Sequence, residues 1–314
     1  MGRYLLKRLI QFPVVLWILI TVSFFMMRLA PGGPFSGEKQ VDPAILAKMN
    51  EKYGLSDPIP RQYVRFLGNL AVLDLGPSFK HKTRTVNEII AERAPVSAVL
   101  GGSAILLALL FGLSAGVIAA IRQNSRWDYA SMAVAMVGLS VPTFVVGPML
   151  ALVMGIWAGL LPVAGFETML GTSWLPKPHY LLLPAFTLSL PFAARIARLT
   201  RAGMLEVIHQ DYIRTAWAKG LTERVIVLRH ALRGALLPVV SFLGPATAEI
   251  LTGSLVVEQV FAFPGLGREF VQSAINRDYT LVMGTVILFG FLLITFNLIV
   301  DVLYGFLDPR IRYA

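Results

Sequence analysis

Among the residue types that most often perform catalysis, this 314-residue chain has no cysteine and only four histidines, which are scattered. The absence of cysteine excludes disulfides, thiolate metal sites and a cysteine nucleophile. The sequence also lacks the phosphate loop GxxxxGK[ST], the zinc motif HExxH and the serine elbow GxSxG, so we expect no ATP hydrolysis through such a loop in this chain. We expect the four scattered histidines to be structural or solvated: His81, His179, His209 and His230.

Acidic residues within apolar stretches are a second possible source of chemistry. Glu249 lies well inside such a stretch, and Glu258 and Asp301 lie nearer the ends of theirs. Ionisable groups at membrane depth often mark transport paths, whereas ion-coupled carriers use several of them as relays. Glu249 is therefore predicted to line a transport path. The alternative is that it pairs with a serine or a backbone group inside a helix bundle.

A mostly polar island, residues 201–237, separates two apolar stretches. It reads as two helices, one over 212–219 that ends at Gly220 as a C-cap, and one over about 223–236. A soluble partner docking on the first helix would explain why an apolar chain retains such a segment. An ordinary amphipathic helix at the membrane surface would explain it equally well.

Composition places these elements in a membrane protein. The chain is 56% hydrophobic and 15% charged, with mean hydropathy +0.68, whereas soluble domains contain about 25% charged residues. Spanning helices need roughly 20 mostly apolar residues. Six segments meet this requirement, and they predict an all-α polytopic membrane protein with six transmembrane helices: about 9–29, 96–121, 129–157, 180–199, 238–260 and 280–307.

Two of these segments have unusual features. The third contains the sequence Ser140-Val141-Pro142-Thr143, which predicts a kink. The fourth contains two prolines and, near its C-terminal end, Arg195 and Arg198, which could extend to the membrane surface. Proline is tolerated in membrane helices where neighbouring groups satisfy the freed carbonyls.

The net charge of +10 arises from dispersed Lys and Arg, which we interpret as topology determinants and not as a nucleic-acid surface. Basic residues of the short segments concentrate at both termini, in the 122–128 loop and in the island. Both termini and the island are therefore predicted to be cytoplasmic, and residues 30–94 extracytoplasmic. This predicts a multi-pass protein of the cytoplasmic membrane.

Three parts of the chain follow from this topology. Residues 1–29 form the N-terminal tail and first transmembrane helix, and residues 30–94 form a helical extracytoplasmic insertion. Residues 95–314 form a five-helix core whose loop 200–237 is the island. Helical spacing of apolar residues predicts two short helices in the insertion, over 43–53 and 61–73.

At the island the chain resembles the permease subunits of ABC importers, whose signature is E-A-A-x3-G followed by Leu-Pro. Thr215, Ala216, Gly220, Leu237 and Pro238 match that signature, although the usual glutamate is missing. The spacing of 18 residues from Gly220 to Pro238 is longer than in sugar and amino-acid permeases. In both departures the chain resembles the dipeptide and oligopeptide branch of the family, whose motif here is R-T-A-x-A-K-G-L.

Further segments extend the resemblance to the first (B-type) permease subunit of oligopeptide importers along nearly the whole chain. They read FMMRLAPG at 25–32, LGPSF at 75–79, PVSA at 95–98, FPGLG at 263–267, NRDY at 276–279 and DPR at 308–310. The resemblance implies the type I importer permease fold.

The resemblance also implies a complex. Its other members are a second, similar permease subunit, two cytoplasmic ATPase subunits that hold ATP and Mg, and an extracytoplasmic peptide-binding protein. This chain would then hold no cofactor, bind no nucleic acid and catalyse no reaction, and it would move peptide across the lipid bilayer by alternating access. The residues implied to couple it to an ATPase are Arg214, Thr215, Ala216, Trp217, Ala218, Lys219, Gly220 and Leu221.

Polar positions within or near the spans are predicted to line the translocation path, although serine and threonine also bond within membrane helices. They are Ser140, Thr143, Ser189, Ser241, Thr247, Glu249, Thr252 and Ser254. The 30–94 segment and one turn are predicted to receive the binding protein, although the turn could simply reverse the chain. The turn comprises Phe263, Pro264, Gly265, Leu266 and Gly267.

Other functions stay open at this point. The cargo could be dipeptides, nickel complexes, haem or antimicrobial peptides in place of oligopeptides. An ion-coupled secondary transporter would need buried relays and often two similar halves, and neither is visible. An intramembrane enzyme would need paired carboxylates, a histidine cluster or a serine–base pair, and none stands out.

Overall fold

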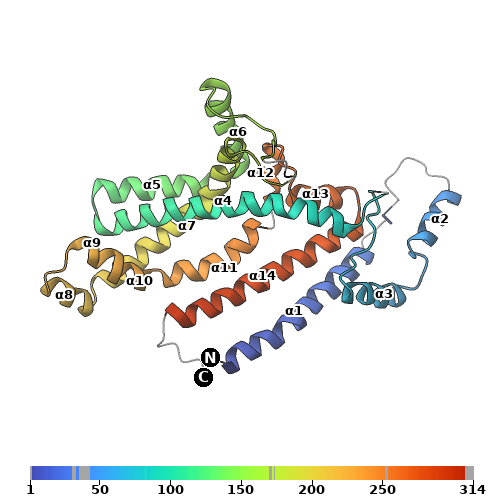
Figure 1. The fold of residues 1–314 in the computed structure, drawn as a ribbon, viewed down its shortest axis with the longest axis horizontal. Helices are drawn as coiled ribbons and strands as arrows, with labels where there is room; N and C mark the ends of the chain where they lie inside the picture. Colours follow the sequence, from blue (N-terminus) through green and yellow to red (C-terminus); the bar gives the residue numbers. More distant parts are fainter. Residues whose placement is uncertain are drawn as a thin grey trace.

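The computed structural model describes residues 2–29, 33–34, 43–81, 83–169, 172, 174–251 and 254–307. These residues are almost entirely helical, and their only β-type pairings are two isolated bridges, Pro77 with Thr85 and Thr168 with Pro176. Figure 1 shows long helices running roughly side by side, with α8, α9 and α10 (residues 211–235) at one end, α2 and α3 (residues 43–71) at the other, and α6 (Thr143–Leu150) projecting from the middle. The prediction of an all-helical membrane protein is therefore confirmed.

Five helical stretches are long and apolar enough to cross a membrane, or six with one bent pair. In chain order the helices that form these five stretches are α1 (Gly2–Leu29), α4 (Val86–Ile121), α7 (Pro178–Ile208), α11 (Leu237–Leu251) with α12 (Leu255–Val260), and α14 (Tyr279–Leu307). The predicted fourth span ended at residue 199, but α7 continues to Ile208. The first residues of the island are thus part of a transmembrane helix.

The bent pair is the predicted third span, and its break lies at the predicted position. Helices α5 (Arg126–Ser140) and α6 (Thr143–Leu150) meet at an angle of 106°, and α6 continues as the π-helical segment Ala151–Trp157. Val141, which precedes Pro142, has an extended backbone. Proline disfavours the helical conformation of the residue before it, so this sequence ends α5.

The centre of the fold is the contact between α4 and α7. The two helices approach so closely that a Cβ added at Gly112 would lie 2.8 Å from the Ala193 carbonyl oxygen. One added at Gly116 would lie 2.6 Å from the Ala197 carbonyl oxygen. Small residues allow such approach between membrane helices, where dispersion contacts drive packing. The glycine spacing of α4 therefore determines which of its faces meets α7.

The insertion after the first long helix contains the two predicted helices, α2 (Pro43–Lys52) and α3 (Ile59–Ala71). Helix α4 begins at Val86, well before the predicted start at 96, because Thr85 and Glu88 form a reciprocal capping box. The last part of the predicted insertion is therefore the first turns of α4.

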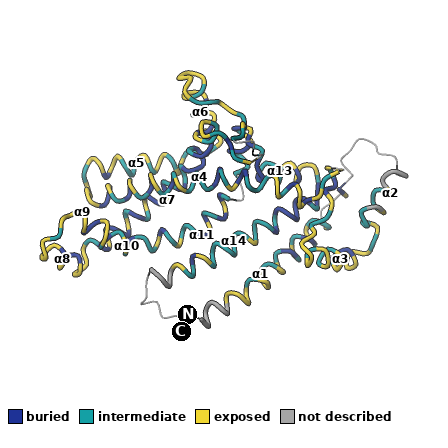
Figure 2. The backbone as a smooth tube through the Cα atoms, viewed as in Figure 1, coloured by how far each residue is buried: buried dark blue, intermediate teal, exposed yellow. Residues whose placement is uncertain are grey.

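Helix α3 packs across the outer ends of α1 and α14, which run alongside each other (Figure 1). Phe24 of α1 lies 5.7 Å from Phe66 and 5.3 Å from Tyr63 of α3, ring centre to ring centre. Met283 and Ile287 of α14 complete this cluster. Figure 2 shows that much of the rest of α1 is exposed, as expected for a helix that faces lipid.

A buried carboxylate fastens the insertion to α14. Asp278, which is 1% exposed, precedes α14 and accepts hydrogen bonds from the backbone N–H of Leu281 at 3.2 Å and of Phe79 at 3.1 Å. The hydroxyls of Ser78 and Thr280 donate to the same carboxylate. One side chain thus caps a membrane helix and holds the end of the insertion against it.

Candidate functional site

The island forms a short helix, α8 (Asp211–Ala218), which ends in a left-handed turn as predicted. Gly220 has φ +72°, and its N–H donates to the Trp217 carbonyl at 2.9 Å. The Leu221 N–H donates to the Ala216 carbonyl at 3.3 Å. These two bonds make a Schellman motif, in which glycine avoids the steric cost of positive φ.

Helix α8 has one buried face and one exposed face. Ile213 and Ala216 are 1% and 5% exposed, whereas the side chain of Arg214 is 74% exposed and Trp217 is 51% exposed. Lys219 and Gly220 are also exposed. The helix therefore directs basic and aromatic side chains outward. Figure 2 shows α8 at one end of the molecule, with both exposed and buried positions.

The buried face of α8 packs against the base of the fold, which is the buried cluster at the end of α7. Ile213 and Ala216 belong to the same buried cluster as Met204 and Val207 of α7 and Ala120 of α4. The predicted second helix of the island closes this cluster as three consecutive pieces: α9 (Glu223–Val225), the π-helical Ile226–Ala231 and α10 (Leu232–Ala235). Helix α8 is thus fixed to the end of a transmembrane helix.

An ion pair reinforces this base. The Arg201 guanidinium of α7 donates from Nε and from one terminal nitrogen to the two oxygens of Asp128, both at 2.7 Å. Asp128 is 2% exposed and also accepts the Asn124 N–H at 3.0 Å. Bidentate pairing of this kind fixes both distance and orientation, so the start of α5 is joined to the C-terminal part of α7.

A cavity of about 250 Å³ brings together three of the predicted path residues: Thr143, Glu249 and Ser254. It lies between the start of α6, the middle of α7, the end of α11 and the residue before α12. Its lining residues are Thr143, Leu188, Pro191, Phe192, Arg195, Glu249, Ile250 and Ser254. Arg195 was expected to extend to the membrane surface, but it lines this cavity. The spacing 188, 191, 192, 195 on one helix face could have indicated this.

The other predicted path residues lie elsewhere. The hydroxyl of Ser189 donates to the Phe186 carbonyl, and that of Ser241 donates to the Leu237 carbonyl, which is the ordinary local bonding of membrane helices. Ser140 is exposed at the end of α5, and Thr247 is half-buried in α11. Thr252 lies outside the described residues.

The turn 263–267 is mostly internal. Phe263 is 0% and Leu266 is 1% exposed, and both glycines are buried, which leaves half-buried Pro264 as its most accessible residue. The turn surrounds the buried carboxylate of Glu258, which accepts the Ser97 hydroxyl at 2.7 Å and the Arg268 N–H at 2.9 Å. This carboxylate therefore caps α13 (Leu266–Ile275) and joins it to α12 and α4.

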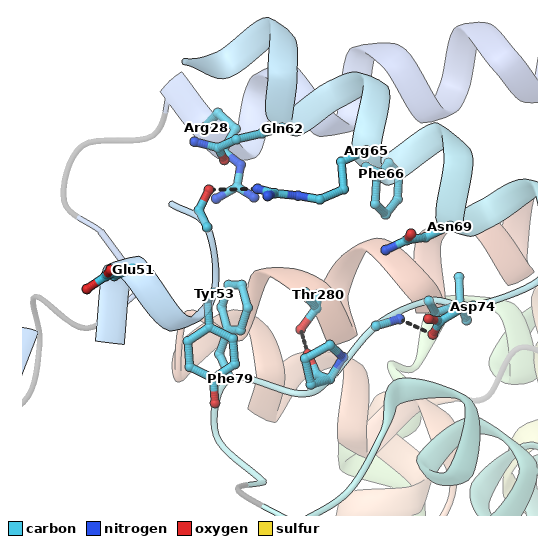
Figure 3. Close-up of a pocket in the computed structure, with 14 residues that line it drawn as sticks. Arg28, Glu51, Tyr53, Gln62, Arg65, Phe66, Asn69, Asp74, Phe79 and Thr280 are labelled. Atoms are coloured by element: carbon cyan, nitrogen blue, oxygen red, sulfur yellow. Dashed lines mark hydrogen bonds between the residues drawn. The ribbon is translucent and has the colours of Figure 1, made fainter. Parts of the chain in front are cut away.

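A second cavity, of about 300 Å³, lies in the predicted docking region. It is enclosed by α3, the segment 74–79, the end of α1 and the start of α14. Figure 3 shows Arg28 beside Gln62 at one side of this cavity and Asp74 at the other. Arg65, which donates to the Gly54 carbonyl at 2.8 Å, holds the α2–α3 connection against α3. The insertion is therefore a folded, polar surface with a hollow in it.

Comparison with known proteins covers nearly the whole chain. Residues 112–313 match the family described as binding-protein-dependent transport system inner membrane component, and residues 1–101 match the corresponding N-terminal family. The chain is 51% identical to an oligopeptide transport system permease protein of Salmonella typhimurium, with 100% of both chains covered. It is 50% identical to the protein of that name in Escherichia coli, with 100% of both chains covered.

A dipeptide transport system permease protein of Bacillus subtilis is 41% identical, over 99% of this chain and 98% of its own length. Together with the five long apolar helices, the bent pair and the exposed helix α8, these matches establish what kind of protein this is. The chain belongs to the family of inner-membrane components of binding-protein-dependent transport systems, the permease subunits of ABC importers.

Proposed function

We propose that this chain carries oligopeptides across the bacterial cytoplasmic membrane, driven by ATP hydrolysis on separate subunits. The names of its full-length relatives support this cargo. The main support for a coupling role is that α8 has one buried and one exposed face. Ile213 and Ala216 are buried in the base, whereas Arg214 and Trp217 face outward. A helix fixed on one side and exposed on the other can transmit force from a docked partner.

The proposed complex contains a second, similar permease subunit and two cytoplasmic ATPase subunits that hold ATP and Mg. Residues 214–221 lie in a cleft of one ATPase, so closure of the ATPase pair displaces α8 and the helix end beneath it. The spans then rock as rigid bodies between outward-facing and inward-facing arrangements. The chain itself supplies mechanical coupling and half of the path, with no catalytic residue.

An extracytoplasmic peptide-binding protein docks on the insertion. Support comes from its folded helices, the hollow beneath α3 and the anchorage through Asp278, which would carry a force from the insertion into α14. The turn 263–267 contributes to this surface through Pro264, because its other residues are buried.

The proposed orientation places both termini and α8 in the cytoplasm. The chain has no cysteine, so a single introduced cysteine reports its own side of the membrane. Cysteine at Lys219 should react with an impermeant maleimide only in inside-out vesicles, and cysteine at Arg61, whose side chain is 75% exposed, only in intact cells. The reverse pattern would contradict the topology.

The function is tested by reconstituting this chain with its partner permease, ATPases and binding protein in liposomes. Peptide-loaded binding protein should stimulate ATP hydrolysis, and a labelled tripeptide should accumulate only with ATP. Preferred uptake of dipeptides would change the assigned cargo from oligopeptides to dipeptides, the cargo in the name of the Bacillus subtilis relative. Uptake of nickel complexes, haem or antimicrobial peptides, with none of short peptides, would overturn the oligopeptide assignment.

A further inference from the structure

The 250 Å³ cavity contains side chains of opposite charge on facing helices. Arg195 comes from α7 and Glu249 from α11, with Thr143 and Ser254 at the helix breaks between them. Ligand sites usually measure about 300–1,000 Å³. A cavity of this size can take the two ends of a short peptide, and the partner permease must then enclose the residues between them.

Arg195 is held in a way that leaves its donors available. Its guanidinium carbon lies 5.3 Å from the ring centre of Phe242, which is the geometry of a cation–π contact. Among the described residues the ion pairs do not include Arg195, and its side chain is exposed to the cavity. Because stacking occupies the planar face of a guanidinium, the N–H edge stays open to a carboxylate, which it can bind in bidentate fashion.

Glu249 provides the complementary charge. It is exposed, and it lies one residue before Ile250, whose side chain also lines the cavity. An ammonium group entering from the exposed side would meet this carboxylate, and the hydroxyls of Thr143 and Ser254 could accept further N–H groups. No metal or cofactor is needed for this recognition, since every contact involves protein side chains.

We propose that Arg195 and Glu249 form a subsite for the charged ends of the peptide, with Arg195 binding the C-terminal carboxylate and Glu249 the N-terminal ammonium. This inference rests on the proposed peptide-import function. Every unmodified peptide carries both end charges whatever its sequence. A subsite that binds only the ends would therefore accept many sequences, and residues between the ends need no specific partner.

The test uses the reconstituted complex and four variants of this chain. Arg195→Gln and Glu249→Gln remove one charge each, and Arg195→Lys keeps the charge but lacks the bidentate fork. Arg198→Gln is the matched control, because Arg198 is exposed on the same helix but does not line the cavity. Uptake of a neutral tripeptide is compared with that of its C-terminal amide and its N-acetyl form, each at saturating loaded binding protein.

Variant-to-wild-type ratios are taken for each peptide separately, so that differences in delivery cancel. The Arg195→Gln complex should take up the tripeptide about tenfold or more slowly than the wild-type complex, because it lacks a hydrogen bond between charged groups. The amide should show no such difference between Arg195→Gln and wild type, because it has no carboxylate to lose. Glu249→Gln should likewise slow uptake of the tripeptide but not of the N-acetyl peptide, which has no ammonium group to lose. Arg195→Lys should be intermediate, and Arg198→Gln should match wild type.

Two results would overturn the subsite. One is an Arg195→Gln variant that transports all three peptides as wild type does. The other is a variant that loses all three equally, which would indicate a structural role. A wild-type complex that hydrolyses ATP but imports none of the peptides would instead refute the proposed function itself.

Discussion

Gly220 offers the sharpest test of the coupling helix, because the structure separates its effect on folding from its effect on a partner. Its φ of +72° is unfavourable for other L-residues, at a cost of about 1–2 kcal/mol per residue. No heavy atom lies within 4 Å of a Cβ placed there. A Cβ at this position therefore meets no neighbour in the chain, and the exposed turn gives a larger side chain room to project outward.

This cost is small beside the roughly 5–15 kcal/mol by which domains are stable. The buried contacts of Ile213 and Ala216 do not involve the Gly220 side of the turn. Gly220→Asn should cost least, since asparagine tolerates the left-handed region, and Gly220→Ala about 1 kcal/mol. Both should fold and transport. Gly220→Trp should also fold, but its large side chain should prevent residues 214–221 from docking in the ATPase cleft.

The assay is ATP hydrolysis stimulated by peptide-loaded binding protein, measured with peptide uptake in the same liposomes. Gly220→Trp should reduce both to the unstimulated level. Gly159→Trp is the matched control, because Gly159 also has positive φ, +62°, and open space around it but lies outside the island. If Gly220→Trp retains full stimulation and uptake, α8 is a passive surface helix and the coupling argument fails.

Three other substitutions test the framework that holds these sites. Asp128→Ala would leave the partly exposed Arg201 unpaired in the base and should cost about 1.5–3 kcal/mol, seen as a lower thermal midpoint in detergent, and an unchanged midpoint would contradict the ion pair's role. Gly116→Val should disrupt the α4–α7 contact and cost about 1–3 kcal/mol, whereas Gly102→Val on the same helix, with nothing within 4 Å, should not. Asp278→Ala should free the segment 77–80 from α14, so protease should cleave there faster than in wild type, and equal cleavage rates would count against the anchor.

The sequence was sufficient to predict features that depend on local chemistry. Hydropathy located the spans because a bilayer requires long apolar helices. Pro142 located the break in the third span, and Gly220 the end of α8, because each residue restricts or permits particular backbone angles. Helix ends were less predictable where polar residues continue a helix, as in the last turns of α7 and in the first turns of α4.

Features that depend on which helices become neighbours could not be predicted in this way. Arg195 and Glu249 are distant in sequence, and nothing local to either indicates that α7 and α11 place them around one cavity. Ser189 and Glu249 look alike as polar residues within apolar segments. Only packing shows that Ser189 bonds to its own helix whereas Glu249 faces a cavity.

The helix α7 connects the two proposed sites and suggests how one could drive the other. It is unbroken from Pro178 to Ile208, with Arg195 at the cavity and Met204 in the base under α8. At about 1.5 Å per residue, these two positions are only about 13 Å apart along the axis. Because Ile213 is buried in the same cluster as Met204, α8 cannot shift without moving the end of α7 or exposing that cluster. Movement imposed on α8 should therefore change the position of Arg195 relative to Glu249, which lies on a different helix.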